Sequence, residues 1–532
     1  MNRNVFRISN IIFSVFLAFA VFLSYKMPTE FKTISWNGMS RSDIGVFCVI
    51  FIVVYLAVVL LGIALDKIEN YPFGEPKVLS RKWIGIIFVT IFLLWFPAFL
   101  AFYPGNLSPD SYSSINQAMT HIISTAHPVL FTLFVKICLE IGILLFHNMN
   151  AAIAIYSIVQ MLMLDGILTY TVWWLMRHGV PRILLGLTVA YYALNPLICR
   201  YSFTMWKDIL FSGTILLLVL FLYDLVTDES RSLKNNDTLM QFVTLSVLVS
   251  FLRNRIVYAV LFVFLLLVIV TRDCRKKLAL VFGITGAFIL VIQGPVYQCL
   301  NIKASNFAEG QGVSLQQIGA VVSEGGKLSD EEREFIDRMI PLEDMASAYR
   351  PGTVDVLKGC STFDHDFLNS HSEEYVRVWR GVVLKNPGIA LKAWLMNTRG
   401  FWGFNVWMEP FAITWPSEEY GIYQNNYIEK YCGIDLAYIS NGLLVHVDKV
   451  PVVRRIFELG TLGWLGVYCC VRQIQKRRNA VLLALLPLNA LWVVLIFTTP
   501  VFFELRYMFS HFLALPVMLC LLLRGDKLRI RK

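Results

Sequence analysis

The sequence is dominated by apolar runs that are long enough to cross a lipid bilayer. A transmembrane helix needs about 20 mostly apolar residues, because each residue rises only about 1.5 Å along the axis. Ten such runs occur at residues 8–25, 44–65, 84–103, 151–174, 183–199, 208–226, 277–297, 455–470, 480–498 and 508–524. Backbone groups in lipid must pair within the chain, so these runs predict an all-α integral membrane protein.

Composition agrees with this class and argues against others. Apolar residues make up 57% of the chain and charged residues 16%, a balance that is unusual for a water-soluble fold of this size. The formal charge of +10 comes from short basic clusters between apolar runs rather than from one basic face, so we expect no nucleic-acid partner. The ten cysteines form no CxxC pair, and no zinc site is predicted.

Two shorter apolar runs, 239–252 and 256–271, lie between two basic segments. The linker 228–236 and the cluster 272–277 are both expected in the cytoplasm, because cytoplasmic loops of membrane proteins are enriched in lysine and arginine. The chain must cross to the outer side and return between them. The pattern therefore predicts a hairpin of two short helices whose tip carries Arg253, Asn254 and Arg255.

The apolar run 128–146 is also long enough to span, but we expect it to lie in or dip into the outer membrane interface. If it spanned, every later basic cluster, including 473–479, would face the outside. Lys136 and Glu140, one helical turn apart, also suit an interfacial helix. This gives twelve spans with both termini in the cytoplasm, and the first span, after Arg3 and Arg7, reads as an uncleaved helix.

This topology divides the chain into three parts. Residues 1–297 are expected to form a transmembrane region, 298–454 a mostly helical extracytoplasmic domain, and 455–532 the last transmembrane helices. Ser329 and Glu332 have the spacing of a capping box at a helix start. The tryptophans near residues 394–407 suggest a helix at the membrane surface, and Cys299, Cys360 and Cys432 are expected outside.

The first outer segment, YPGNLSPDSYSSINQAMTHIISTAHP at 103–128, contains Asp110 as its only acidic residue and no lysine or arginine. Proline and glycine force turns before it, so Asp110 or Ser111 is expected to cap a helix. A carboxylate at a membrane surface can also act as a general base, because partial burial raises its pKa from about 4 toward neutrality. Both roles stay open from the sequence.

Several segments resemble the GT-C class of polytopic membrane glycosyltransferases. An aspartate early in the first large outer loop, followed by His127-Pro128 and an interfacial helix, is similar to that class. NPLICRYSFTMWKDILF at 195–211 resembles its second outer loop, and FFELRYMFSHFLALP at 502–516 resembles a terminal motif of related bacterial enzymes. LQQIGAVV at 315–322 and YRPGTVDVLK at 349–358 resemble the outer domain of an uncharacterised bacterial branch.

The resemblance implies an inverting glycosyltransferase in a bacterial plasma membrane. Its donor would be a sugar on a polyprenyl phosphate, and its acceptor an envelope glycan or lipid. Asp110 is then the expected catalytic base, and the expected substrate-binding residues are His127, Lys207, Asp208, Arg253, Arg255, Glu504, Arg506 and Tyr507. A lone aspartate departs from the paired acidic motif of metal-dependent members, so no metal or other cofactor is indicated.

Alternatives remain at the level of residues and of function. Lys207 with Asp208, or Arg506 with Glu504, would be internal ion pairs without a substrate role. His127 before proline is equally a structural residue. A flippase or transporter of lipid-linked sugars, a polymerase or ligase of lipid-linked glycans, and an envelope scaffold are the competing functions. A transporter usually carries repeated halves, and the sequence shows no internal repeat.

Overall fold

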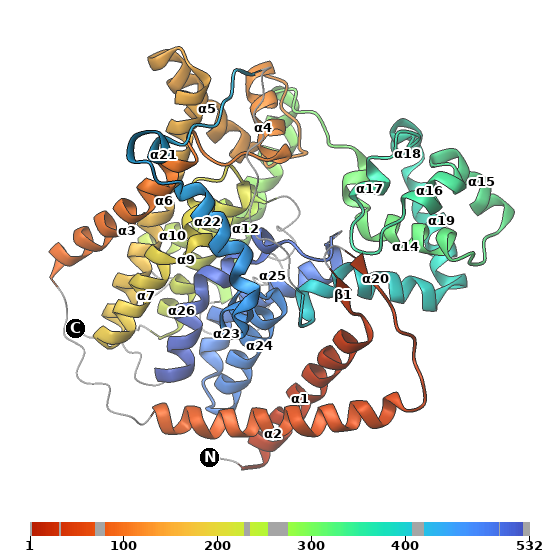
Figure 1. The fold of residues 1–532 in the computed structure, drawn as a ribbon, viewed down its shortest axis with the longest axis horizontal. Coiled ribbons are helices and arrows are strands. Elements are labelled where there is room, and N and C mark those ends of the chain that lie inside the picture. Colours follow the sequence, from red (N-terminus) through yellow and green to blue (C-terminus); the bar gives the residue numbers. More distant parts are fainter. Residues whose placement is uncertain are drawn as a thin grey trace.

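The computed structural model describes residues 3–30, 33–69, 80–227, 235–253, 275–406, 420–499 and 501–524. Within these ranges the chain is almost entirely helical (Figure 1), and the strands that form a sheet are the short antiparallel pair β1 (Thr29–Glu30) and β2 (Thr33–Ile34). The predicted all-α membrane architecture is therefore confirmed.

Nine helical segments in the described ranges are long and apolar enough to cross a bilayer. They are built on α1 (Arg3–Lys26), α2 (Asp43–Glu69), α3 (Arg81–Ala101), α5 (Val129–Phe146), α6 (Met149–Arg177), α9 (Lys207–Thr227), α12 (Arg275–Val291), α25 (Asn479–Thr498) and α26 (Phe509–Arg524). A tenth would join α7 (Arg182–Leu194) to α8 (Pro196–Ser202) across a 55° bend. The chain is thus a membrane-embedded protein.

The predicted count of twelve spans stays a prediction. The expected spans 239–252 and 455–470 correspond to α10 (Asn236–Leu252) and α24 (Leu459–Gln475), each 17 residues long and short for a full crossing. The expected span 256–271 lies outside the described residues.

One end of the bundle gathers the ends of several helices around α4 (Pro109–Thr120), and we call it the α4 end. Gln160, eleven residues into α6, donates Nε2 to the carbonyl of Ser202 at the end of α8 (2.9 Å). Met205, just before α9, donates its N–H to the carbonyl of Asn106 (3.0 Å). The linkers after α3 and α8 are therefore fixed to each other beside α6.

The opposite end is held by ion pairs between the first two helices and the last ones. Arg472 of α24 contacts Asp66 of α2 at 2.7 Å, and Arg478 contacts Glu69 at 2.8 Å. Gln475 also donates Nε2 to Asn10 Oδ1 of α1 at 2.7 Å. These contacts join the N-terminal hairpin to the rest of the bundle.

Helix α5 has both of its ends toward the α4 end, although its length and composition would allow it to span. His127, just before α5, contacts Lys207 at the start of α9, and α5 turns back tightly into α6 at Asn148, whose side chain caps α6. Figure 1 shows α5 beside α4 at the top of the bundle. Its interfacial placement stays a prediction.

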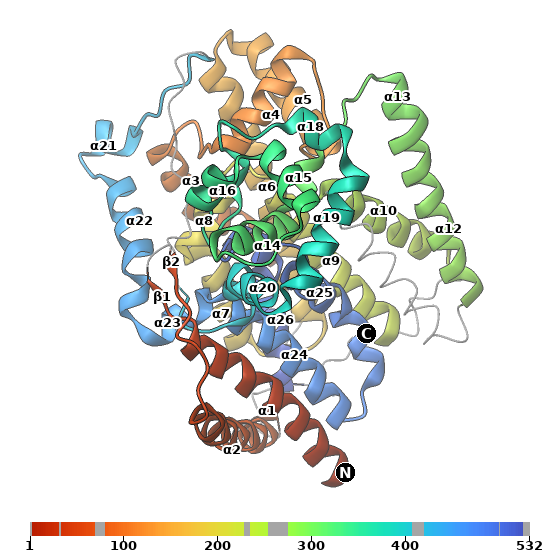
Figure 2. The same ribbon diagram turned by 90° about the vertical axis from the view of Figure 1, so that its right-hand side faces the viewer.

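A separate helical domain stands beside the bundle in Figure 1 and before it in Figure 2. It comprises η2 (Phe307–Gly310), α14 (Gly312–Ser323), α15 (Asp330–Met339), α16 (Leu342–Ala348), α17 (Asp355–Lys358), α18 (His365–Ser370) and α19 (Ser372–Lys385) around a core of its own. The predicted capping box is confirmed, because Ser329 Oγ accepts from the Glu332 N–H and the Glu332 carboxylate accepts from the Ser329 N–H.

The predicted bounds of the extracytoplasmic segment, 298–454, stay a prediction, and the separate core lies at residues 308–382 of it. After it, α20 (Pro387–Trp402) leads back to the bundle, and Trp394 donates Nε1 to the Ile496 carbonyl of α25 (3.0 Å). The next helices along the chain are α21 (Tyr427–Cys432), α22 (Leu436–Val445) and α23 (Pro451–Phe457). Leu444 of α22 is buried in the bundle core. Leu436 and Ala437 also pack against this core, so α22 belongs to the bundle rather than to the separate domain. The three cysteines expected outside are free thiols.

Candidate functional site

The site is built on the first turn of α4. Ser108 precedes the helix with an extended backbone and donates its N–H to Ser111 Oγ (3.0 Å), while Pro109 occupies the first helical position. Trp206 donates Nε1 to Ser108 Oγ at 2.7 Å and so ties this turn to the start of α9. Asp110 is thereby held in the first turn, where the helix dipole also favours a negative charge.

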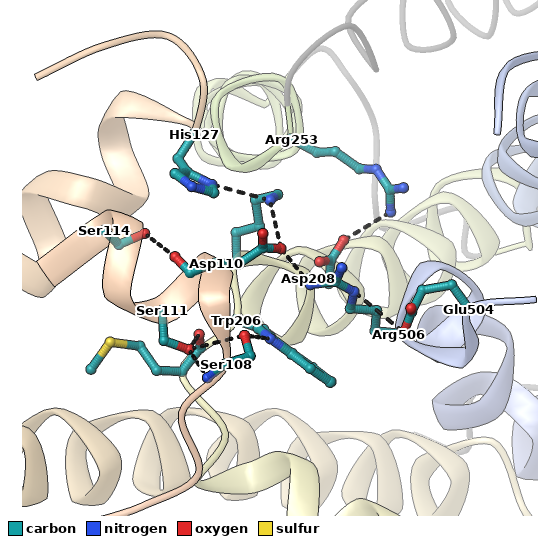
Figure 3. Close-up of polar contacts among 12 residues, drawn as sticks. Ser108, Asp110, Ser111, Ser114, His127, Trp206, Asp208, Arg253, Glu504 and Arg506 are labelled. Atoms are coloured by element: carbon teal, nitrogen blue, oxygen red, sulfur yellow. Dashed lines mark hydrogen bonds and ion pairs between the residues drawn. The ribbon is translucent and has the colours of Figure 1, made fainter. Parts of the chain in front are cut away.

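Two cations from distant parts of the chain meet the Asp110 carboxylate (Figure 3). Arg506, in the 3₁₀ turn η5 (Leu505–Met508), places Nη1 2.5 Å from Asp110 Oδ2. Lys207, the first residue of α9, places Nζ 3.7 Å from the same oxygen. The Asp110 side chain remains 38% exposed, so the carboxyl group is partly accessible from outside the protein.

These cations overturn the expected direction of the Asp110 pKa. Burial alone would raise it, as the sequence suggested, but the charges of Arg506 and then Lys207 outweigh burial and hold the pKa well below its usual range. The expectation of a raised pKa is therefore wrong, since the sequence did not place two cations beside the carboxylate. Asp110 is ionised at neutral pH.

His127 supports Lys207 from the other side. Its Nδ1 lies 3.3 Å from Lys207 Nζ. Burial, followed by the nearby Lys207 charge, lowers the pKa of His127 to about 4, so the imidazole is neutral at pH 7. A neutral Nδ1 accepts a hydrogen bond from the ammonium group, which leaves Lys207 held between a neutral acceptor and the Asp110 carboxylate.

A second ion pair lies beside the first. Arg253, at the end of α10, places Nη1 3.0 Å from Asp208 Oδ1, and the Asp208 side chain is fully buried. The guanidinium also stacks 4.6 Å from the ring centre of Tyr507. Asp208 thus pairs with Arg253, whereas the neighbouring Lys207 contacts Asp110.

Arg506 is fixed by further contacts around its guanidinium. Glu504 Oε1 lies 3.4 Å from Arg506 Nε, and the ring centre of Trp206 lies 4.7 Å from the Arg506 guanidinium carbon. Burial raises the pKa of Glu504, with Arg506 opposing that shift and the nearby Asp208 and Asp110 charges adding to it. The carboxylates of Asp110, Asp208 and Glu504 are therefore each paired with a cation at the α4 end.

Side-chain contacts bring eight of the nine residues predicted for the site to this cluster, and Arg255 lies outside the described residues. Sequence reasoning missed Trp206 and Ser108, which orient Arg506 and the Asp110 turn. The sequence signal that could have identified Trp206 as a site residue is its position immediately before Lys207. In the described residues, no group of three or more histidine, cysteine, aspartate or glutamate side chains is arranged to hold a metal ion.

Residues 115–531 match the model of DUF6020, a family of unknown function. The chain belongs to this family. The DUF6020 match includes Lys207, Asp208, Arg253 and Arg506 and begins just after Asp110. Searches of curated proteins and of solved structures found no match.

Proposed function

We propose that this DUF6020 chain is an inverting glycosyltransferase that moves a sugar from a polyprenyl-phosphate carrier to an envelope glycan or lipid. One observation carries the proposal: an ionised, partly exposed Asp110 shares its oxygen with two cations at the end of a membrane bundle. A carboxylate can accept a proton from a hydroxyl group, and adjacent cations can accept the charge of a departing phosphate. This combination suits sugar transfer from a phosphate leaving group.

The residues of the site account for the proton and the electron pair that move in the proposed reaction. Asp110 takes the proton of the acceptor hydroxyl while that oxygen attacks the anomeric carbon from the face opposite the phosphate. The bond from the anomeric carbon to the phosphate oxygen breaks, and its electron pair stays on the phosphate. Arg506 and Lys207 stabilise the added negative charge, and a single displacement inverts the anomeric configuration.

The low pKa of Asp110 is compatible with a role as the base, because binding of the donor changes the charges around the carboxyl group. The charges of Arg506 and Lys207 hold the carboxylate ionised, which makes it a weak base. A donor phosphate that takes hydrogen bonds from Arg506 and Lys207 withdraws part of their charge from Asp110. The pKa of the carboxyl then rises, so the base is strengthened when the donor is in place.

The remaining side chains have supporting roles in the proposal. Arg253 offers a further contact for the donor phosphate beside Tyr507, and Asp208 keeps it in position. Glu504 orients Arg506, and neutral His127 orients Lys207 or the acceptor. A carrier lipid would reach these residues from the bilayer. We assign the α4 end to the outer face of a bacterial plasma membrane, with both termini in the cytoplasm, from the distribution of basic loops.

The test is transfer of radiolabelled sugar from polyprenyl-phosphate donors to envelope extract in membranes that carry the wild-type chain or Asp110→Asn at matched expression. Asp366→Asn, at an exposed position of the helical domain, is the matched control. We expect transfer by the wild type and the control and its loss in Asp110→Asn. Equal transfer in all three removes Asp110 as the base. No transfer in any of them overturns the proposal in favour of a flippase, polymerase or ligase.

A further inference from the structure

The main chain just before Arg506 is held from both sides by other parts of the protein. The Phe502 N–H donates to the Gly352 carbonyl of the helical domain at 2.8 Å, and Thr353 pairs with Val501 in an antiparallel bridge. From the other side, the Gly400 N–H of α20 donates to the Phe502 carbonyl at 2.7 Å. Both polar groups of the Phe502 backbone are therefore fixed.

Helix α20 makes a second contact one turn earlier. The buried Asn397 donates Nδ2 to the Thr499 carbonyl at 2.7 Å. The side chains of Phe502 and Phe503 are also buried in the bundle core, so they cannot move without repacking their neighbours. The segment that leads into η5 is thus attached to α20 at two points and to the helical domain at a third.

Gly400 is the point at which this attachment depends on residue size. A Cβ added at Gly400 would overlap the Phe502 carbonyl oxygen and would lie 3.0 Å from its carbonyl carbon and 3.2 Å from Phe503 Cα. All three are backbone atoms, which cannot rotate aside as the end of a side chain can. Any side chain at Gly400 must therefore displace the segment or the end of α20.

The segment that such a displacement would move leads directly to Arg506, the cation proposed to stabilise the leaving phosphate. Only three residues separate Phe502 from Arg506, and Glu504 between them is extended before the η5 turn begins. A shift of the Phe502 carbonyl therefore moves the Arg506 guanidinium relative to Asp110. A misplacement of about 1 Å in a reacting group is enough to lower a catalytic rate about a hundredfold.

We propose that Gly400 is a positioning residue. Because Gly400 has no side chain, α20 can approach closely enough for the Gly400 N–H to bond to the Phe502 carbonyl, and this contact sets where Arg506 meets Asp110. The inference rests on the proposed transferase function for its kinetic consequence. The geometric part, that Gly400 fixes the segment 501–508, is independent of that function. The helical domain holds the same segment from the other side, because its Gly352 carbonyl accepts from the Phe502 N–H.

The experiment compares Gly400→Ala with Gly388→Ala in the purified full chain in nanodiscs. Gly388 is in the same helix and has no atom within 4 Å of an added Cβ, so the control makes the same chemical change without a clash. Asn397→Ala is the milder variant, because it removes the Thr499 contact without adding an atom. It keeps the test decisive if Gly400→Ala does not fold.

Two readouts separate the positioning role from the function. In the transfer assay, we expect Gly400→Ala to lower kcat at least tenfold with KM changed less than threefold, Asn397→Ala to lower kcat less, and Gly388→Ala to match the wild type. A purely structural defect would instead reduce the folded fraction and leave kcat per folded molecule unchanged, which would overturn the inference.

Hydrogen–deuterium exchange of peptides covering 501–508 is the second readout and needs no activity. We expect faster exchange there in Gly400→Ala and Asn397→Ala than in Gly388→Ala. If the wild type transfers no sugar, the proposed function fails, and exchange alone decides the positioning role. If Gly400→Ala and Asn397→Ala, where they fold, exchange at the same rate as Gly388→Ala, the positioning role is overturned, whatever the transfer assay shows.

Discussion

Replacing Arg506 with glutamine tests two parts of the proposed mechanism at once: the stabilisation of the leaving phosphate and the ionisation of Asp110. The substitution removes the closest cation from Asp110, at 2.5 Å, and leaves Lys207 at 3.7 Å as the remaining charge on that oxygen. Loss of one preorganised donor to a developing anion typically lowers kcat by about 10²–10³-fold. We expect a loss of this size in sugar transfer, since Lys207 alone must then stabilise the leaving phosphate.

The same change alters the pH dependence in a defined direction. In the wild type the Asp110 pKa is held low, so the carboxylate stays ionised and kcat/KM shows no acidic limb from Asp110 above about pH 5. Without Arg506, burial is opposed mainly by Lys207, and the pKa rises toward or above its ordinary value of about 4. Protonation then removes the base as pH falls, and kcat/KM of the variant declines at the acidic end.

The assay is the pH profile of transfer by wild type, Arg506→Gln, Arg506→Lys and the exposed control Arg333→Gln. Arg506→Lys retains the charge but loses the forked geometry, so its rate should fall between those of the wild type and Arg506→Gln. Arg333→Gln should follow the wild type. A rate for Arg506→Gln within threefold of the wild type, or a variant pH profile with no decline of kcat/KM at the acidic end, would refute the reasoning.

Three further predictions concern stability and orientation. Arg253→Ala leaves the fully buried Asp208 without its ion-pair partner and should destabilise the protein by about 3 kcal/mol, seen as a lower Tm in detergent, with partial recovery on adding Asp208→Asn. Trp206→Phe keeps a ring beside Arg506 but loses a hydrogen bond worth about 1 kcal/mol, so kcat/KM should fall by up to about tenfold; an unchanged value would exclude an orienting role. Gly142→Ala would overlap the α6 backbone and should lower stability by about 1–3 kcal/mol in thermal unfolding, whereas Gly166→Ala, with open space around its Cβ, should not.

The class of the protein and most of its helices followed from the sequence alone. A run of apolar residues is a local property, and lipid forces such a run into a helix whatever it packs against. Capping at Ser329 was predictable for the same reason, because the hydrogen bonds close within four residues. The grouping of Asp110 with Arg506 depended on a charge-derived topology that put both at the same end.

Other features could not be read from the chain. One of them is the placement of α22, which packs on α3 and α8, because hydropathy does not say which neighbour buries a residue. The need for glycine at position 400 depends on where Phe502 lies in space. Neither relation leaves a local pattern in the sequence.

The Asp110 pKa shows the same division most clearly. The sequence predicted a carboxylate at the membrane edge, and partial burial of such a group raises its pKa. Tertiary structure decided the sign, because it brings Arg506, nearly four hundred residues away, to 2.5 Å from that carboxylate. Burial is set by local surroundings, whereas the Coulomb interaction depends on distances that only the folded chain defines.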